Sequence, residues 1–198
     1  MGPLKVVGLV AAVAFLAIVG TIVVQQRTGV PSEDSVDVGF LQDMIAHHGQ
    51  AVQLGTIASQ TAADPTVARF GLEAVTSQQY EVGYMTALLE DWGLGTNDAS
   101  DDREAMAWMG MGMSVGSMPG MASADQLEAF RTMTGDQTDA EFLRLMSDHH
   151  RGGFTMARTA ADKAADPRVR ALATRIANNQ GAELREYEAL ADRLGVQL

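Results

Sequence analysis

The residues best suited to chemistry are a methionine and two adjacent histidines, which occur together twice. The two copies of this Met-x-x-His-His motif are Met44, His47 and His48, followed by Met146, His149 and His150. On a helix, residues three and four positions apart share a face, so the thioether and an imidazole of one copy could reach the same metal ion. Thioether sulfur selects Cu(I), and imidazole serves either oxidation state of copper. The motif therefore predicts a copper site, with Cu(I) favoured and Cu(II) possible.

Glutamates and further methionines could support such a site. Glu81 and Glu183 fall on the helices expected to partner the motifs, three residues after Gln78 and Gln180. Each glutamate could accept the free imidazole N–H, or could bind the metal directly and make the site harder. A glycine-rich stretch adds closely spaced thioethers, a form suited to transient capture of Cu(I) where thiols are absent. The candidate methionines in this stretch are Met111, Met113, Met118 and Met121.

A purely structural interpretation of the same residues stays open. A pair of adjacent histidines on a helix is often structural, and Met44 and Met146 could be ordinary core residues. Other positions have diverged between the two copies, for example Gln50 against Gly152, whereas all three motif residues persist. This persistence favours a site. The methionines of the glycine-rich stretch could equally cover a hydrophobic surface.

The motif belongs to a long internal repeat, which indicates how it is positioned. Residues 62–65, Ala-Ala-Asp-Pro, return as residues 164–167, at the same offset of 102 (149 − 47) that separates the motifs. In each copy the aspartate suits the N-cap of a helix and the proline its first position. Asp37 and Asp139 open the two copies. Each copy therefore predicts a helical hairpin with the motif on its first helix.

Two duplicated helical hairpins predict an all-α fold, a four-helix bundle with a pseudo-two-fold axis. We expect capping boxes, which pair a Ser or Thr at the N-cap with Glu or Gln three residues later, at Ser123–Gln126 and Thr138–Glu141. The predicted segments are an anchor at 1–27, a linker at 28–36, a first hairpin at 37–93, a Met/Gly-rich linker with a short helix at 94–138, and a second hairpin at 139–198.

The N-terminal segment predicts a membrane anchor. Residues 4–24 are apolar apart from Lys5 and Thr21, and about 20 such residues span a hydrocarbon core of about 30 Å. A cleaved signal peptide, which usually has a shorter apolar region, and a buried core helix are the alternatives. The free α-amino group adds positive charge on the Lys5 side, and the acidic residues Glu33 and Asp34 follow the segment. Both favour a C-terminal domain outside the cytoplasm, although acidic residues count for little in this rule. The expected location is a single-pass protein of the cell membrane.

Composition excludes several classes of function. With 14 Lys and Arg against 25 Asp and Glu, the net charge is −11, so a nucleic-acid partner is not expected. The chain has no cysteine, which excludes disulfides and thiolate ligands. No catalytic triad, phosphate loop or nucleotide fingerprint is visible. Di-iron bundles need Glu-x-x-His, but the residues three positions before the histidines are Met44, Ile45, Met146 and Ser147. We therefore predict a binding protein, with metal-dependent oxidoreductase activity left open.

The sequence from Asp37 to Gly195 also resembles a known bacterial family, domain of unknown function 305. The resemblance rests on both Met-x-x-His-His motifs, on Met118-Pro119-Gly120-Met121, and on Gln78-x-x-Glu81-x-x-x-Met85. It implies a ferritin-like four-helix bundle and copper binding or tolerance outside the cytoplasm, because some members resemble copper-resistance proteins of the CopM type. The motif residues would be the metal ligands, with Met85 as a further candidate.

These observations predict a membrane-anchored copper-binding protein that buffers copper, confers tolerance or delivers the metal. Its expected partners are the membrane and, in the case of delivery, a copper enzyme or a membrane protein complex. The alternative is a structural accessory subunit of a membrane complex such as a respiratory oxidase, with little or no role for a metal.

Overall fold

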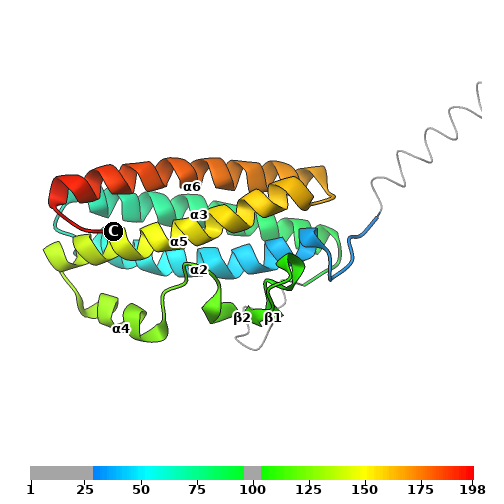
Figure 1. Ribbon diagram of the computed structural model, residues 1–198, viewed down its shortest axis with the longest axis horizontal. Helices are drawn as coiled ribbons and strands as arrows, with labels where there is room; N and C mark the ends of the chain where they lie inside the picture. Colours follow the sequence, from blue (N-terminus) through cyan, green and yellow to red (C-terminus); the bar gives the residue numbers. More distant parts are fainter. Residues whose placement is uncertain (1–28, 96–103) are drawn as a thin grey trace, which may run out of the picture. The chain divides into compact units, whose positions relative to one another are not determined.

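The computed structural model describes residues 29–95 and 104–198, and residues Ser32–Leu198 belong to one compact unit. Its helices are α2 (Val36–Thr61), α3 (Pro65–Asp91), α4 (Ala124–Thr132), α5 (Asp136–Lys163) and α6 (Pro167–Leu194) (Figure 1). In its described part, the linker between α3 and α4 carries two short strands and two 3-10 turns: β1 (Glu104–Ala105), η1 (Ala107–Met109), β2 (Met113–Ser114) and η2 (Val115–Ser117). The predicted all-α class is confirmed.

The four long helices form two hairpins that pack side by side. Helix α2 packs along α3, α5 packs along α6, and the hairpins meet mainly through α2 and α5, which run antiparallel (Figure 1). Within the first hairpin the backbones come close at Gly55 and Gly71. A Cβ added to Gly55 would lie 2.5 Å from the carbonyl oxygen of Gly71, so no side chain fits there.

Local capping explains where most helices begin and end. The carboxylates of Asp64 and Asp166 accept hydrogen bonds from the backbone of their own first turns, and proline follows each of them. Gly195 ends α6 in the left-handed conformation, with φ of +69°. The predicted capping box of Ser123 and Gln126 is confirmed, since both of its reciprocal hydrogen bonds form at the start of α4.

The second predicted capping box is wrong, and the linker contains structure that was not predicted. Helix α5 begins at Asp136, before the expected cap, and Thr138 lies buried inside it with its hydroxyl 3.3 Å from that of Thr61. In the linker, β1 and β2 pair antiparallel, with Ala105 opposite Met113. Two-residue strands leave too short a pattern for sequence periodicity to detect.

The hydrophobic core is divided into two clusters by a band of buried polar residues. One cluster, here called the methionine end, contains five buried methionines: Met44, Met85, Met106, Met118 and Met156. The other, here called the tyrosine end, contains Met146, Leu54 and Tyr187 beside phenylalanines and alanines. Each long helix contributes two polar residues between the clusters, here called the histidine layer, and all of them are buried except the partly exposed Glu183: His47, His48, Gln78, Glu81, His149, His150, Gln180 and Glu183.

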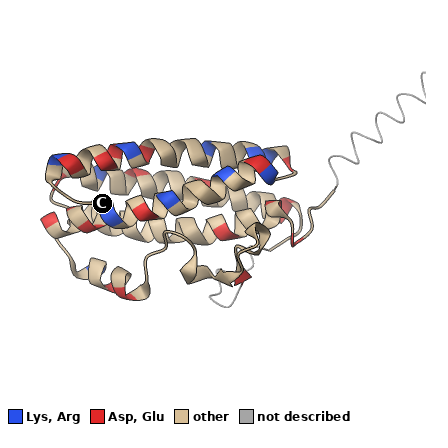
Figure 2. Cartoon of the chain, in the orientation of Figure 1, with Lys and Arg blue, Asp and Glu red and all other residues tan. Residues whose placement is uncertain are grey.

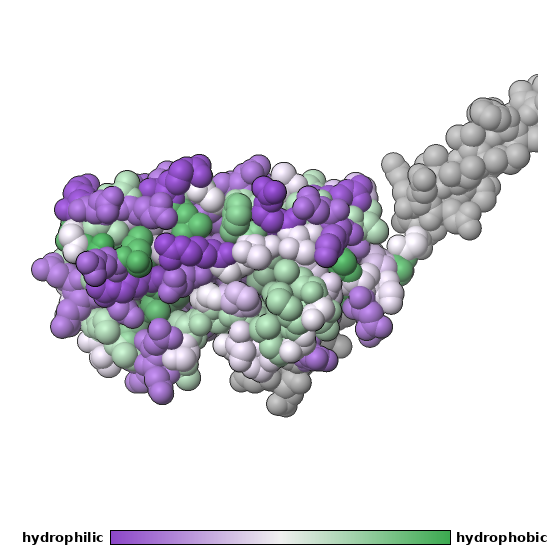
Figure 3. All heavy atoms as spheres, in the orientation of Figure 1, coloured by the Kyte–Doolittle hydropathy of each residue, from purple (hydrophilic) through white to green (hydrophobic). Residues whose placement is uncertain are grey.

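The described Lys and Arg side chains lie exposed on the outside of the bundle. Lys and Arg gather along α5 and α6 in the view of Figure 2, and two of them pair with acidic groups at the ends of α3: Arg168 with Asp91 at 2.8 Å, and Arg193 with Asp64 at 3.0 Å. Exposed pairs of this kind contribute little to stability. The surface where the linker covers the bundle is more hydrophobic (Figure 3), and Met111 is 40% exposed in the same linker.

No helix in residues 29–95 and 104–198 is both long and apolar enough to cross a membrane. The anchor predicted at residues 1–27 lies outside the residues that the structure describes.

Two aspartates tie the hairpins together reciprocally. The carboxylate of Asp37, at the start of α2, accepts hydrogen bonds from the backbone N–H groups of Ala165 and Asp166 at 2.9 and 2.7 Å, in the turn of the second hairpin. Its repeat counterpart Asp139 accepts from the N–H groups of residues 63–64 at 3.0 and 2.9 Å, in the turn of the first. Both carboxylates are buried.

Replacing either aspartate by alanine should destabilise the fold by similar amounts. Asp37→Ala and Asp139→Ala each leave two backbone N–H groups without their acceptor, at a cost of about 1–3 kcal/mol for each unsatisfied group that stays buried. Urea denaturation followed by circular dichroism measures the loss. The exposed Asp34 provides the control, since Asp34→Ala should leave the midpoint almost unchanged. Equal midpoints for all three variants would contradict the proposed tie.

Candidate metal centre

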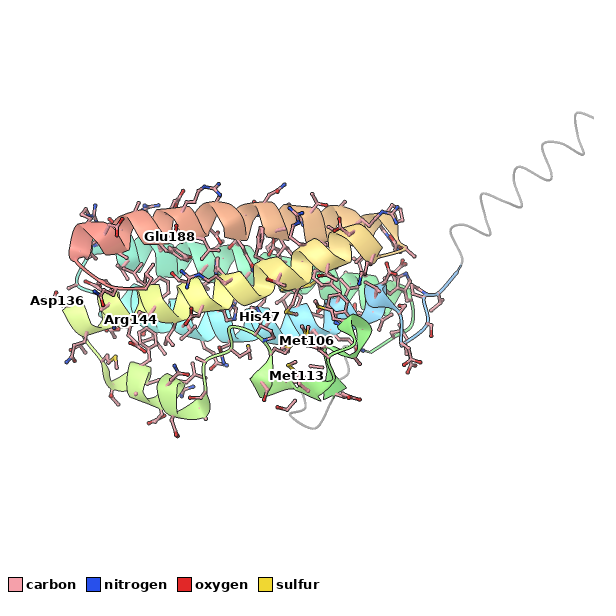
Figure 4. The ribbon with its side chains drawn as sticks, viewed as in Figure 1. His47, Met106, Met113, Asp136, Arg144 and Glu188 are labelled. Carbon is pink, nitrogen blue, oxygen red and sulfur yellow. The ribbon has the colours of Figure 1, made fainter. Side chains whose placement is uncertain are left out.

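The histidines of both motifs meet where α2 and α5 pack together. His47, His48, His149 and His150 are all fully buried. The rings of His47 and His149 face each other, with centroids 3.7 Å apart and planes inclined by 34°. Figure 4 places His47 where the linker approaches α2, with Met106 nearby. The duplication therefore brings both histidine pairs into one layer across the bundle.

Two of the four imidazoles are held by glutamates on the partner helices. The Nε2–H of His48 donates to Glu81 at 2.8 Å, and that of His150 donates to Glu183 at 2.6 Å. These are the two glutamates expected from the sequence to accept an imidazole N–H. They differ in environment, because the side chain of Glu81 is 8% exposed and that of Glu183 is 31% exposed.

The other two imidazoles donate to backbone carbonyl groups. The Nε2–H of His149 donates to the carbonyl oxygen of His47 at 2.9 Å, and that of His47 donates to the carbonyl oxygen of Pro119 at 3.2 Å. Because a carbonyl oxygen only accepts, the hydrogen of both rings lies on Nε2. The linker thus supplies one of the groups that fix the histidine layer.

In all four histidines the second ring nitrogen, Nδ1, is buried and has no hydrogen-bond partner among the residues that the structure describes. When the hydrogen lies on Nε2, Nδ1 carries a lone pair and can bind a metal. The side-chain amides of Gln78 and Gln180 are also buried without partners within the described part of the chain. Buried polar atoms are nearly always paired, so this concentration of unpaired donors and acceptors makes the layer a candidate binding site.

Burial keeps at least two of these rings neutral. Burial lowers the pKa of His47 to about 3, an effect that nearby His48 increases and the hydrogen bond to Pro119 opposes. The pKa of His149 lies well below its ordinary value for the same main reason, with the neighbouring His47 adding to the shift. At neutral pH both rings therefore keep their lone pairs, which metal binding requires.

The methionines of the two motifs do not converge at one point. Met44 lies in the methionine end and Met146 in the tyrosine end, on opposite sides of the histidine layer. Among the other candidates, Met85 and Met118 are buried in the methionine end, Met113 and Met121 pack against it, and Met111 is exposed. The sequence did not single out Met156, whose repeat counterpart is Leu54. The half-site of Met44 is therefore the richer in thioethers.

The donor set fits a soft metal better than a hard one. Within residues 29–95 and 104–198, no group of three or more His, Asp or Glu side chains is arranged to hold a metal ion. A site here would need thioethers beside the imidazole Nδ1 atoms, and such ligands select Cu(I). Imidazole and thioether are both donor types that copper accepts, so the residues present fit copper, with the glutamates orienting the rings.

Sequence reasoning missed the residues that fasten the linker to α2. The carboxylate of Asp43 is buried and accepts hydrogen bonds from the backbone N–H of Met106 at 2.8 Å and from the indole of Trp108 at 2.7 Å. Trp108 packs against Gly39 and leaves no room there for a Cβ. One signal was available, because Asp43 occupies the position that Leu145 takes in the second repeat.

Comparison with known proteins identifies the family of the chain. Residues 37–191 match the family model described as domain of unknown function (DUF305). The chain belongs to the DUF305 family. The resemblance noted from the motifs is thereby confirmed. Neither the description of the DUF305 family nor the similar structures name an enzymatic activity, in agreement with the prediction of a binding protein. No curated protein matches the chain.

Solved structures share the DUF305 fold. A DUF305 protein from Streptomyces coelicolor, provisionally described as secreted, is 32% identical, with 84% of this chain and 98% of that chain covered and a TM-score of 0.76. A DUF305 fragment from Deinococcus radiodurans is 29% identical over 80% of this chain and 96% of that one, with a TM-score of 0.68. CopM in its Cu(I)-bound form is 21% identical over 79% and 96%, with a TM-score of 0.58. At this identity the likeness to CopM shows the fold alone.

The location predicted from the sequence requires a correction. No helix of the described ranges is long and apolar enough to cross a membrane, and the Streptomyces DUF305 protein is provisionally described as secreted. Because residues 1–27 lie outside those ranges, the correction of the predicted single-pass location in the cell membrane rests on the secreted relative.

The buried histidines should make stability depend on pH. Unfolded histidine titrates near 6.5, whereas folded His47 binds a proton only near pH 3, so unfolding takes up protons below about pH 6.5. The free energy of unfolding should therefore fall as the pH drops from 6.5 toward 3, by up to about 1.4 kcal/mol per pH unit for each such histidine. Urea denaturation of the metal-free protein between about pH 7 and pH 5 measures this slope.

The matched control is the double variant His47→Gln, His149→Gln. The glutamine amide can replace the Nε2–H donor but does not titrate, so the slope over this pH range should become shallower. A slope equal to that of the wild-type protein would mean that these two histidines are not the groups that titrate.

Proposed function

We propose that this DUF305 protein binds copper in its histidine layer, preferring Cu(I), and that it serves in copper buffering, tolerance or delivery. The observation that carries the proposal is the set of four buried imidazoles whose Nε2–H groups are all engaged and whose Nδ1 atoms have no partner in the described residues. The candidate ligands are His47, His48, His149 and His150, with Met44 and Met146 completing the two half-sites.

The hydrogen bonds of the layer support this proposal. In protein metal sites, a ligating imidazole usually donates its other N–H to a carboxylate or a backbone carbonyl group, which fixes the ring and makes the ligating nitrogen more basic. His48 and His150 have the carboxylate form of this arrangement, and His47 and His149 have the carbonyl form. A purely structural layer would gain nothing from four unpaired Nδ1 atoms, because each carries a desolvation penalty.

The distribution of sulfur supports Cu(I) at the half-site of Met44. Four further buried methionines share its cluster, whereas the cluster of Met146 holds Tyr187 and Leu54 at the positions equivalent to Met85 and Met156. Thioethers select Cu(I). Unlike thiols, they cannot form disulfides, and this chain has no cysteine that could supply a thiol ligand instead. CopM, which shares the fold, has been solved with Cu(I), Cu(II) and silver bound. We expect the two half-sites to differ in affinity.

Copper titration tests the proposal without disrupting the layer. His48→Gln and His150→Gln keep an amide N–H that can donate to the glutamate, while they remove Nδ1. The double variant should fold and should lose at least about tenfold in Cu(I) affinity, since even the loss of an outer partner costs that much in metal sites. Titration with a competing Cu(I) chelator measures the affinity, and Gln53→Ala, at an exposed position on α2, is the control. Unchanged affinity in the folded double variant would leave His48 and His150 structural, as an accessory subunit would have them.

The two motif methionines should contribute unequally. Met44→Leu removes a thioether from the methionine end, whereas Met146→Leu removes one from the tyrosine end, and each exchange nearly conserves volume. Met44→Leu should therefore cost more Cu(I) affinity than Met146→Leu, and the variant that carries both should lose more Cu(I) affinity than Cu(II) affinity. Parallel titrations with the two oxidation states measure this difference. Equal losses for Cu(I) and Cu(II) would refute the role of the thioethers.

A further inference from the structure

One segment of the linker, residues 118–122, crosses the bundle directly over the paired histidines. We call it the strap. In Figure 1 the chain rises from η2 to the bundle here and descends again to α4. Its Pro119 carbonyl accepts the hydrogen bond from His47. On the α5 side no Cβ fits on Gly152, because it would meet the carbonyl of Pro119, and none fits on Gly120, because it would meet the backbone of Asp148.

The strap is held on the α2 side by one buried glutamine. The side-chain amide of Gln50 donates to the carbonyl oxygen of Ala122 at 2.9 Å, and its oxygen accepts from the N–H of the same residue at 2.6 Å. Both the glutamine and Ala122 are buried. Two hydrogen bonds to one residue fix both the position and the direction of the backbone. Gln50 lies three residues after His47, so it stands on the same face of α2.

The two repeats differ where they touch the strap. The repeat counterpart of Gln50 is Gly152, so one copy carries the side chain that clamps the strap and the other has no side chain where the strap crosses. The strap also makes the hydrogen bonds of His47 and His149 different. His47 donates to the strap, whereas His149 donates to the backbone of α2. The strap also carries Met118 into the methionine end.

We propose that Gln50 is a positioning residue for the copper site. By clamping the strap it keeps the carbonyl of Pro119 on Nε2–H of His47, which leaves the lone pair of this ring on Nδ1, and it holds the thioether of Met118 in the methionine end. Without the clamp, His47 loses its fixed acceptor and can place its hydrogen on either nitrogen. The part that concerns copper rests on the proposed function, whereas the control of the His47 tautomer does not.

The first test is the tautomer of His47 in the metal-free protein. Nitrogen-15 NMR distinguishes the two neutral forms of an imidazole. In the wild-type protein His47 should carry its hydrogen on Nε2 alone, and in Gln50→Leu both forms should be populated. His150, held by Glu183, is the internal reference and should not change. Gln53→Leu, at an exposed position on the same helix, is the matched control.

A second variant guards against a folding defect of the first. Gly152→Ala displaces the strap from the α5 side and leaves Gln50 intact, and alanine is the better helix former. It should shift the His47 tautomer in the same direction. Both variants should bind Cu(I) about tenfold more weakly than the wild type, the lower range for the loss of an outer partner in a metal site.

The outcomes separate the two proposals. A wild-type protein that takes up no Cu(I) refutes the proposed function, and the tautomer then still decides whether Gln50 positions His47. If His47 keeps its hydrogen on Nε2 alone in both folded variants, the positioning role is overturned. If the tautomer shifts while Cu(I) affinity stays at the wild-type value, the strap does not serve the copper site.

Discussion

The burial of four imidazoles in the middle of the core is the constraint on which the rest of the structure depends. A buried polar group is costly unless it is paired, so each ring needs an acceptor for its N–H. Helices α3 and α6 provide Glu81 and Glu183, α2 provides a backbone carbonyl group, and the linker provides Pro119. Each long helix must therefore keep its register at the level of the layer, and the linker must return to the bundle rather than extend into solvent.

The duplication provides an almost symmetric frame, and the linker makes it unequal. Asp37 and Asp139 tie the hairpins through equivalent hydrogen bonds, and both glutamate–histidine pairs recur at the same offset. The differences gather where the linker packs, since the methionine end receives Met106 and Met118 from it. The two copies of the repeat thus place Met44 among further thioethers and His150 beside an aromatic ring, with the ring centroids of Tyr187 and His150 5.2 Å apart.

Local and periodic features could be predicted from the sequence, but long-range contacts of irregular segments could not. Asp64 with Pro65 is a local helix signal, and the spacing of Glu81 on its helix was enough to suggest a partner for an imidazole. The separation of Met44 from Met146 depends on α2 and α5 running antiparallel, so that the turn before each histidine pair points toward opposite ends. The contacts of Asp43 and Gln50 join residues 63 to 72 positions apart through a linker without periodicity, and no local rule specifies them.

The histidine layer also shows why a metal and the fold should be coupled. In the described residues, four Nδ1 atoms and the amides of Gln78 and Gln180 are buried without partners, so the metal-free protein bears their desolvation cost. A metal that binds the folded protein at these atoms would offset part of this cost and stabilise the native state by mass action. Apolar side chains at the same positions would often make the native state at least as stable. Residues that break a packing rule in this way are commonly functional. The unpaired atoms of the layer therefore support the proposed copper binding better than they support a purely stabilising role.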